Sequence, residues 1–244
     1  MLKKEFSDAF KTFMECMILL LGVPLGFVFD KLIIHYGWKL SEIFHFVFLA
    51  TILIYPLVAG LTIFQSERKD RAFEYLFSLP LSRFDIIMYK IAPRFMFLLL
   101  LIIVSTFFSI FDNIWINGFN LIVVFFASSF LSISVNSFVI GVVGISFIFS
   151  AYYQASHTIH LIFIDWNPLK YNLFSTIALL SYLITAVLLL IPMGMAFWIT
   201  FKNFDVKPLK WLLKSYIYIV VPTVLAFYSF IFLFFKKFAE LSGL

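Results

Sequence analysis

Long apolar stretches that are almost free of charge constrain the fold of this chain more than any other feature. Seven such stretches occur within 244 residues, and each is close to the length of about 20 residues with which a helix crosses the hydrocarbon core of a bilayer. Only 13% of the residues are charged and 63% are hydrophobic, so a water-soluble fold could not cover this much apolar surface. The sequence therefore predicts an all-α membrane protein, in which each helix satisfies its own backbone hydrogen bonds in lipid.

The predicted architecture is a single transmembrane domain over residues 1–244, a bundle of six to seven transmembrane helices. The expected spans are about 14–30, 43–64, 91–111, 119–136, 137–154, 175–200 and 216–235. We found no linker or low-complexity segment between them that would divide the chain into separate domains.

An amphipathic helix is expected over residues 1–13, before the first span. Its apolar side chains recur at helical spacing, at Leu2, Phe6, Phe10 and Phe13. Lysines and Asp8 occupy the other faces, which is the pattern of a helix that lies in the membrane interface. The alternative is a simple helical extension of the first span.

The basic residues predict how the chain is oriented in the membrane. Thirteen of the 18 Lys and Arg residues lie before the first span or in the loops 65–94 and 201–214, and only three lie in the intervening loops. Since Lys and Arg are retained on the cytoplasmic side, we expect a multi-pass protein of the cell inner (cytoplasmic) membrane with a cytoplasmic N-terminus. The net charge of +5 is then explained by topology, and no nucleic acid is implied.

Two stretches pose questions of topology. An even number of crossings must separate the two basic loops, so we expect 119–154 to form a hairpin that turns near Asn136 and Ser137. If 216–235 also crosses, Lys236 and Lys237 lie outside, against the charge rule. The sequence leaves open whether this last segment spans the membrane or is re-entrant or tilted.

Residues 65–94 combine charge with a helical pattern between two spans. The apolar positions at helical spacing are Phe73, Leu76, Phe77 and Pro80. Leu79 precedes a proline, so a helix over about 67–79 should end there. Ser82 and Asp85 are three residues apart, as in a capping box, and predict the start of a second helix that continues into the third span.

This segment resembles the coupling-helix signature of type-2 ABC exporter permeases, the transmembrane subunits of ABC transporters. The matching residues are Glu67, Arg68, Glu74, Leu76, Pro80, Ser82, Arg83 and Lys90. The family usually has Gly-Thr between the two acidic residues, where this chain has Arg71 and Ala72. The resemblance covers roughly residues 1–206, because residues 201–206 are similar to a common ending of these permeases.

The resemblance implies a permease subunit that moves its substrate by alternating access, in the direction of export. A separate cytoplasmic ABC ATPase subunit would bind the ATP, and a second permease copy or homologue would complete the dimer in the lipid bilayer. The residues implied in coupling to the ATPase are Glu67, Arg68, Lys69, Asp70, Arg71, Phe73, Glu74, Leu76, Phe77, Pro80, Arg83 and Lys90. This chain has no Gly-x-x-x-x-Gly-Lys-Ser/Thr phosphate loop, so we expect neither a cofactor nor catalytic residues of its own.

Other polar residues predict structural roles. His157 and His160 lie in an expected outward loop, where a pair of interfacial histidines is favoured over a metal site, which needs further ligands. Ser128, Ser129 and their polar neighbours are interpreted as helix-packing residues in preference to substrate contacts.

Two other functional classes stay open at this stage: an intramembrane enzyme and a non-transporting membrane anchor. The chain has neither a Glu-Glu pair, as in prenyl-processing proteases, nor an Asp-x-x-Asp motif, as in lipid-alcohol transferases.

The predicted topology can be tested by labelling single cysteines. In a Cys16→Ser background, Lys69→Cys should react with a membrane-impermeant maleimide in inside-out vesicles but not in right-side-out vesicles, because its loop is expected in the cytoplasm. Lys170→Cys, in a loop expected outside, is the matched control and should show the opposite pattern. Labelling of Lys69→Cys from the exterior would overturn the predicted orientation.

Overall fold

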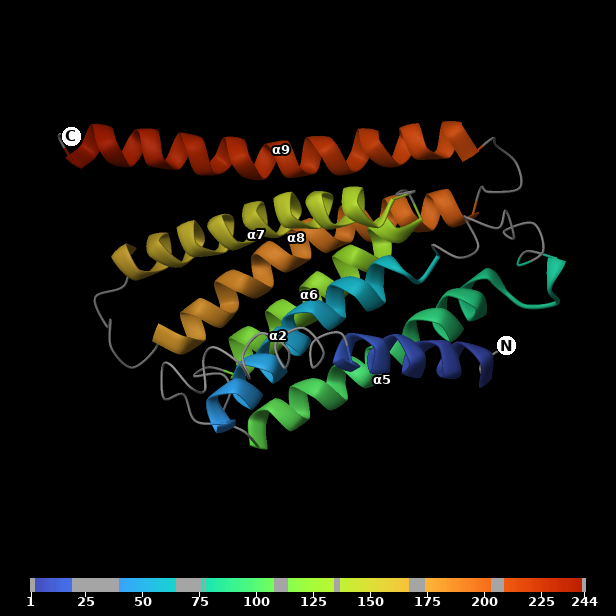
Figure 1. The fold of residues 1–244 in the computed structure, drawn as a ribbon. Helices are drawn as coiled ribbons and strands as arrows, with labels where there is room; N and C mark the ends of the chain where they lie inside the picture. The colour runs from blue at the N-terminus through green and yellow to red at the C-terminus, as the bar shows by residue number, and fades with distance from the viewer. Residues whose placement is uncertain are drawn as a thin grey trace. The chain divides into compact units, whose positions relative to one another are not determined.

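The computed structural model of the chain describes residues 3–18, 40–64, 76, 78–107, 114–133, 137–166, 174–202 and 209–242. Within these ranges all regular structure is helical, which confirms the predicted all-α class. An N-terminal helix over residues 3–18 is followed by six helices with gaps between them (Figure 1). They are α2 (Leu40–Leu61), α5 (Arg83–Phe107), α6 (Ile114–Ser132), α7 (Phe138–Trp166), α8 (Phe174–Lys202) and α9 (Leu209–Ser242).

Four of the described helices are long and apolar enough to cross a membrane. These segments are Arg83–Thr106, Trp115–Ser132, Phe138–His160 and Ala178–Lys202. In each of the four segments, no more than 50% of the most apolar stretch is buried inside the structure. Each helix therefore also presents large apolar side chains outward. A surface of this kind is stable against lipid, and the described helices therefore support a membrane-embedded protein. Shorter apolar helical segments lie at Thr51–Leu61 and Val220–Phe234.

The chain divides into two compact units, Met1–Ser129 and Phe130–Leu244. In the first unit the N-terminal helix lies against α5 (Figure 1). The Phe97 ring on α5 contacts the rings of Phe6, Phe10 and Phe13, with centroids 5.3 to 5.9 Å apart. This face of the N-terminal helix was expected to lie in lipid. In the structure, Phe6 and Phe10 pack on α5 with one side of their rings and stay about half exposed.

Small residues bring α2 and α6 together in the first unit. A Cβ atom added to Gly60 of α2 would lie 2.5 Å from the Ser128 Cβ and 2.8 Å from the Phe125 carbonyl oxygen of α6. Ser128 and Ser129 are buried, and their hydroxyls donate to the Val124 and Phe125 carbonyls within α6. Close approach over small residues is how helices associate in lipid, which agrees with the predicted packing role of these serines.

In the second unit, α7, α8 and α9 run alongside one another (Figure 1). The rings of Tyr152 on α7 and Tyr182 on α8 are 6.0 Å apart. The Tyr228 hydroxyl of α9 donates to the Phe147 carbonyl of α7 at 3.2 Å. The last turn of α6 belongs to this unit, where Phe130 packs on Phe197 of α8 with ring centroids 5.4 Å apart.

The described helices differ from the expected spans at several ends. The N-terminal helix continues to residue 18, so it has no break at residues 13–14, where the interfacial helix was expected to end and the first span to begin. Residues 19–30 of the first span lie outside the described residues. α6 and α7 are separate helices on either side of residues 133–137, where the hairpin turn was expected.

The helix that carries the expected fifth span extends beyond residue 154, because α7 continues to Trp166. The end of the span itself stays a prediction. The polar residues after 154 lower the hydropathy, but no Gly or Pro interrupts the helix before Pro168. The placement of His157 and His160 in a loop is wrong for the same reason, since both lie on α7.

The last helix is also longer than expected. α9 is one continuous helix of 34 residues through Pro222, whereas the apolar segment was expected at 216–235. It lacks the central turn that a re-entrant loop would need. Whether α9 crosses the membrane stays a prediction.

Replacing Gly60 by Ala should destabilise the first unit by about 1–3 kcal/mol, because the added methyl group meets backbone atoms of α6 that cannot move aside. The measurement is thermal unfolding in detergent, monitored as the loss of the monodisperse peak in size-exclusion chromatography. Gly194→Ala is the matched control, since its Cβ would meet only the Phe130 ring at 3.4 Å, an ordinary contact. An unchanged unfolding temperature for Gly60→Ala would show that α2 and α6 are not packed this closely.

Candidate functional site

The candidate site is a buried ionic cluster where the N-terminal helix meets α5 and the end of α2. We define the ionic cluster as Glu5, Lys90 and Arg94. Glu5 lies on the N-terminal helix, while Lys90 and Arg94 lie one turn apart on α5. Their side chains are only 7%, 2% and 6% exposed, which is rare for charged groups unless they are paired.

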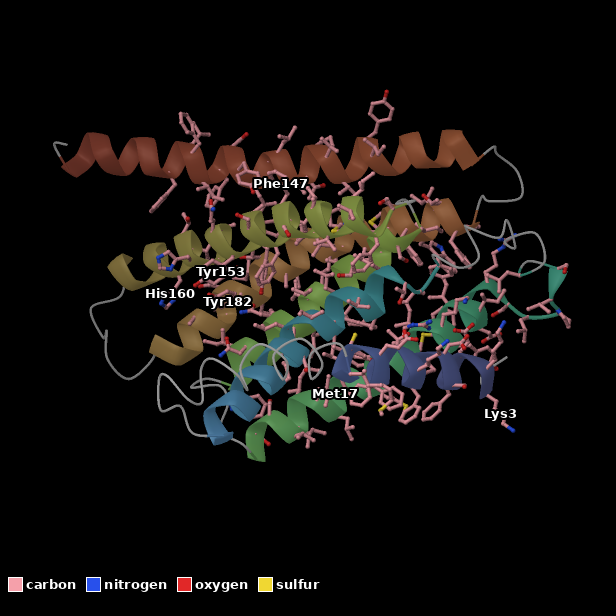
Figure 2. All side chains as sticks on the ribbon, viewed as in Figure 1. Lys3, Met17, Phe147, Tyr153, His160 and Tyr182 are labelled. Atoms are coloured by element: carbon pink, nitrogen blue, oxygen red, sulfur yellow. The ribbon has the colours of Figure 1, made fainter. Side chains whose placement is uncertain are left out.

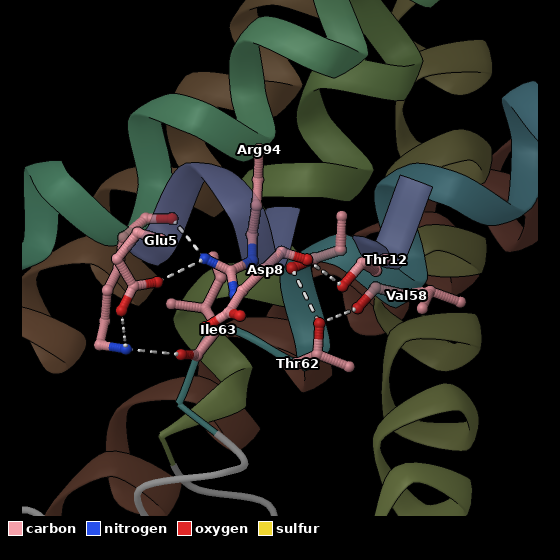
Figure 3. A network of polar contacts seen from close by, with 9 residues as sticks. Glu5, Asp8, Thr12, Val58, Thr62, Ile63 and Arg94 are labelled. Atoms are coloured by element: carbon pink, nitrogen blue, oxygen red, sulfur yellow. Dashed lines mark hydrogen bonds and ion pairs between the residues drawn. The ribbon is translucent and has the colours of Figure 1, made fainter. Parts of the chain in front are cut away.

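One carboxylate binds both cations of the ionic cluster (Figure 3). Lys90 Nζ lies 3.0 Å from Glu5 Oε1, and an Arg94 guanidinium nitrogen lies 3.2 Å from Glu5 Oε2. Each oxygen of Glu5 therefore accepts a charge-assisted hydrogen bond. A buried charge is tolerated only with such partners, so the three side chains depend on one another.

The ionic cluster also joins α5 to α2. Lys90 Nζ donates to the Ile63 carbonyl just after α2, at 3.5 Å, and lies 5.6 Å from the centroid of the Phe64 ring. The Tyr55 hydroxyl on α2 donates to the Arg94 carbonyl at 3.1 Å. The Lys90 bond satisfies the Ile63 carbonyl in an apolar interior and fixes the end of α2 beside α5, and the Tyr55 bond adds a second contact between the two helices.

Helical spacing explains how the sequence brings these groups together. On the N-terminal helix, Glu5, Ala9 and Cys16 are the buried residues, and they share one face. Lys90 and Arg94 are four residues apart on α5, so both point toward that face. Arg94 also donates to the Lys90 carbonyl within the helix, at 2.8 Å.

The start of α5 forms as predicted. The Asp85 backbone N–H donates to the Ser82 hydroxyl at 3.1 Å, and that hydroxyl donates to the Asp85 carboxylate at 2.6 Å. The pair satisfies an otherwise unpaired N–H of the first turn and places an acidic side chain at the positive helix end. The predicted capping role of Ser82 and Asp85 is confirmed, and it fixes the residue at which α5 begins.

Only part of the predicted coupling segment lies within the described residues. Leu76 is helical and buried, Pro80 is exposed at a bend over residues 79–81, and Arg83 begins α5. The bend before Ser82 agrees with the helix end expected at Leu79. The other predicted coupling residues lie outside the described residues: Glu67, Arg68, Lys69, Asp70, Arg71, Phe73, Glu74 and Phe77.

Two sequence expectations about this region need correction. Lys90 and Arg94 were counted among the charges of the loop 65–94, but both lie on α5 and are buried in the ionic cluster. Glu5 was not singled out, although it shares its helix face with Ala9 and Cys16 and not with the lysines. That position, together with the four-residue spacing of Lys90 and Arg94, is the sequence signal that could have identified the cluster.

The described residues offer no evident catalytic or metal centre. They contain no group of three or more His, Cys, Asp or Glu side chains that could hold a metal ion. The ionic cluster itself is arranged to join elements, because Lys90 Nζ and an Arg94 guanidinium nitrogen are directed at Glu5 and at backbone carbonyls. Neither a family model, nor a curated protein, nor a solved structure matches this chain.

Neutralising Glu5 should destabilise the protein strongly. Glu5→Gln leaves Lys90 and Arg94 buried without their carboxylate, a change that typically costs about 3–5 kcal/mol. The measurement is the unfolding temperature in detergent. Glu15→Gln is the matched control on the same helix, because Glu15 is exposed and its ion pair with Lys11, at 3.7 Å, lies at the surface, so it should change little.

A double-mutant cycle extends this test. If the ionic cluster acts as a unit, Glu5→Gln combined with Lys90→Gln should be less destabilising than the sum of the two single changes. Additive effects would contradict the direct pairing of Glu5 with Lys90.

Proposed function

We propose that this chain is the membrane-spanning permease subunit of an ATP-binding cassette transporter, and that it exports its substrate by alternating access driven by a separate ATPase subunit. The proposal places the chain in the cell inner membrane with its N-terminus in the cytoplasm. It rests first on the resemblance of residues 67–90 to the coupling-helix signature.

The observation that carries the proposal is the position of Lys90, the last residue of that signature. Lys90 binds Glu5 on the N-terminal helix and the Ile63 carbonyl at the end of α2. The segment that carries the signature follows the turn at residues 62–64, just after α2, and enters α5 at Arg83. Both of its ends are therefore tied to the ionic cluster, so a force on this segment would act on α2, α5 and the N-terminal helix together.

The proposed mechanism uses this connection. Closure of the ATPase subunits on ATP pushes on the coupling helix at 67–79, and the motion passes to α2 and α5, which shift the pathway between inward-facing and outward-facing states. The charged residues Glu67, Arg68, Lys69, Asp70, Arg71 and Glu74 fix the register of docking, while Phe73, Leu76 and Phe77 fill an apolar groove or lie on the membrane surface. ATP stays on the ATPase subunit, and a second permease copy or homologue completes the pathway.

The proposal is tested by neutralising the two acidic residues of the signature. The ABC ATPases encoded in the same genome are screened for binding to the chain, and the one that binds is purified together with it. ATP hydrolysis by this complex is then measured in proteoliposomes. Glu67→Gln with Glu74→Gln should lower the stimulation of hydrolysis by about tenfold, since two charge-assisted contacts worth roughly 1.4 kcal/mol or more together are lost.

A matched control removes two carboxylates elsewhere. Asp112→Asn with Asp165→Asn changes the charge equally at two positions expected on the outer side, Asp165 being in the last turn of α7, and should leave the stimulation unchanged. The proposal fails if no ABC ATPase binds the chain, or if both double variants stimulate hydrolysis as well as the unchanged chain.

A further inference from the structure

Residues 215–235 of α9 carry no charged side chain on any face of the helix. Lys214 precedes this uncharged stretch, and Lys236 and Lys237 follow it. At a rise of about 1.5 Å per residue the stretch is about 32 Å long, which matches the hydrocarbon core of a bilayer, about 30 Å thick. Pro222 lies within it and does not interrupt the helix. α9 is therefore long enough and apolar enough to cross a membrane, with lysines at both ends of the crossing.

A position flat on the membrane surface does not fit α9. A helix that lies in the interface turns a polar face to water, as the N-terminal helix does with its exposed Lys4, Asp8 and Lys11. Figure 2 shows side chains projecting from α9 both toward α7 and away from it. Val220 and Ile231 share the buried side of α9. Large apolar side chains are exposed around most of the remaining circumference: Ile217, Val221, Leu225, Phe230, Phe232 and Leu233. Such a surface is stable against lipid on all its sides.

The packing of α9 in the second unit gives the direction in which it crosses. α9 runs alongside α7 and α8, in the same direction as α7 and opposite to α8 (Figure 1). The Tyr228 hydroxyl donates to the Phe147 carbonyl, and both residues lie well inside the apolar segments of their helices, Val220–Phe234 and Phe138–His160. The apolar parts of α7 and α9 are therefore side by side, and a bilayer that surrounds α7 surrounds α9 too.

The lysines around α9 agree with this direction. The lysines that precede the uncharged stretch outnumber those that follow it: Lys202, Lys207, Lys210 and Lys214 against Lys236 and Lys237. Because the end of a span that is richer in Lys and Arg is retained in the cytoplasm, the start of α9 is expected there. Lys236 and Lys237 oppose the charge rule when they are counted alone, but not when the two ends of this helix are compared.

We propose that α9 is a membrane-spanning helix parallel to α7, and that its C-terminal end lies on the side of the bilayer where α7 ends and α8 begins. In the expected orientation this is the outer side. A partner on the cytoplasmic face can then contact α9 only around its start, near Lys210, whereas the end of α9 is accessible only to molecules outside. The proposal does not rest on the proposed function, because it concerns only which side of the bilayer each end of α9 occupies.

Labelling of single cysteines at the two ends of α9 tests the proposal. In a Cys16→Ser background, Lys210→Cys and Lys237→Cys should react with a membrane-impermeant maleimide in vesicles of opposite orientation, because a spanning helix places its ends on opposite sides. Lys170→Cys, between α7 and α8, is the reference, and Lys237→Cys should share its pattern. Labelling of both ends in the same vesicles, as a surface or re-entrant helix would give, or of Lys237→Cys in neither, would overturn the proposal.

A cysteine in the middle of α9 tests whether lipid surrounds it. Leu225 is 57% exposed in the structure and lies inside the uncharged stretch. In proteoliposomes, Leu225→Cys should react with a charged methanethiosulfonate roughly tenfold more slowly than Lys237→Cys, because the reactive thiolate forms only where water is present. Equal rates would place this part of α9 in water and overturn the proposal. No ATPase takes part in either measurement, so their outcome is independent of the test of the Glu67 and Glu74 variants.

Discussion

A single carboxylate shared by two cations holds the first unit of this protein together. Glu5 is buried with Lys90 and Arg94, and none of the three could stay charged in an apolar interior without the others. The same lysine also satisfies the carbonyl of Ile63, so the pairing fixes the N-terminal helix, α5 and the end of α2 at one point. The packing of Phe97 against three phenylalanines of the N-terminal helix follows from this position.

The two kinds of helix contact in this chain follow the chemistry of lipid. At Gly60 the absence of a side chain lets backbones approach, and dispersion forces then stabilise the contact. At the ionic cluster, long side chains fix the register of the helices through directed hydrogen bonds. The first kind of contact tolerates no added methyl group, and the second tolerates no lost charge.

The sequence predicted the class of the fold and several helix ends, because these depend on local chemistry. Hydropathy indicated the helices α5, α6 and α8, and the spacing of Ser82 and Asp85 predicted the start of α5. The length of α7 was not predicted, since a helix continues through Gln154 and His157 beyond the apolar run as long as no Gly or Pro interrupts it. The ionic cluster was not predicted, because its residues are 85 and 89 positions apart and a charge count assigns lysine and arginine to loops. The coupling segment between α2 and α5 stays a prediction.

The distance along the chain between Glu5 and its partners has a consequence for biogenesis. Glu5 is synthesised 85 residues before Lys90, so until Lys90 is made the young chain carries an unpaired glutamate on the face that will later be buried. Until α5 is inserted, that face is better solvated at the membrane surface than inside it. Docking of the N-terminal helix is therefore a late step of assembly, and it closes the first unit only after the third predicted span has entered the bilayer.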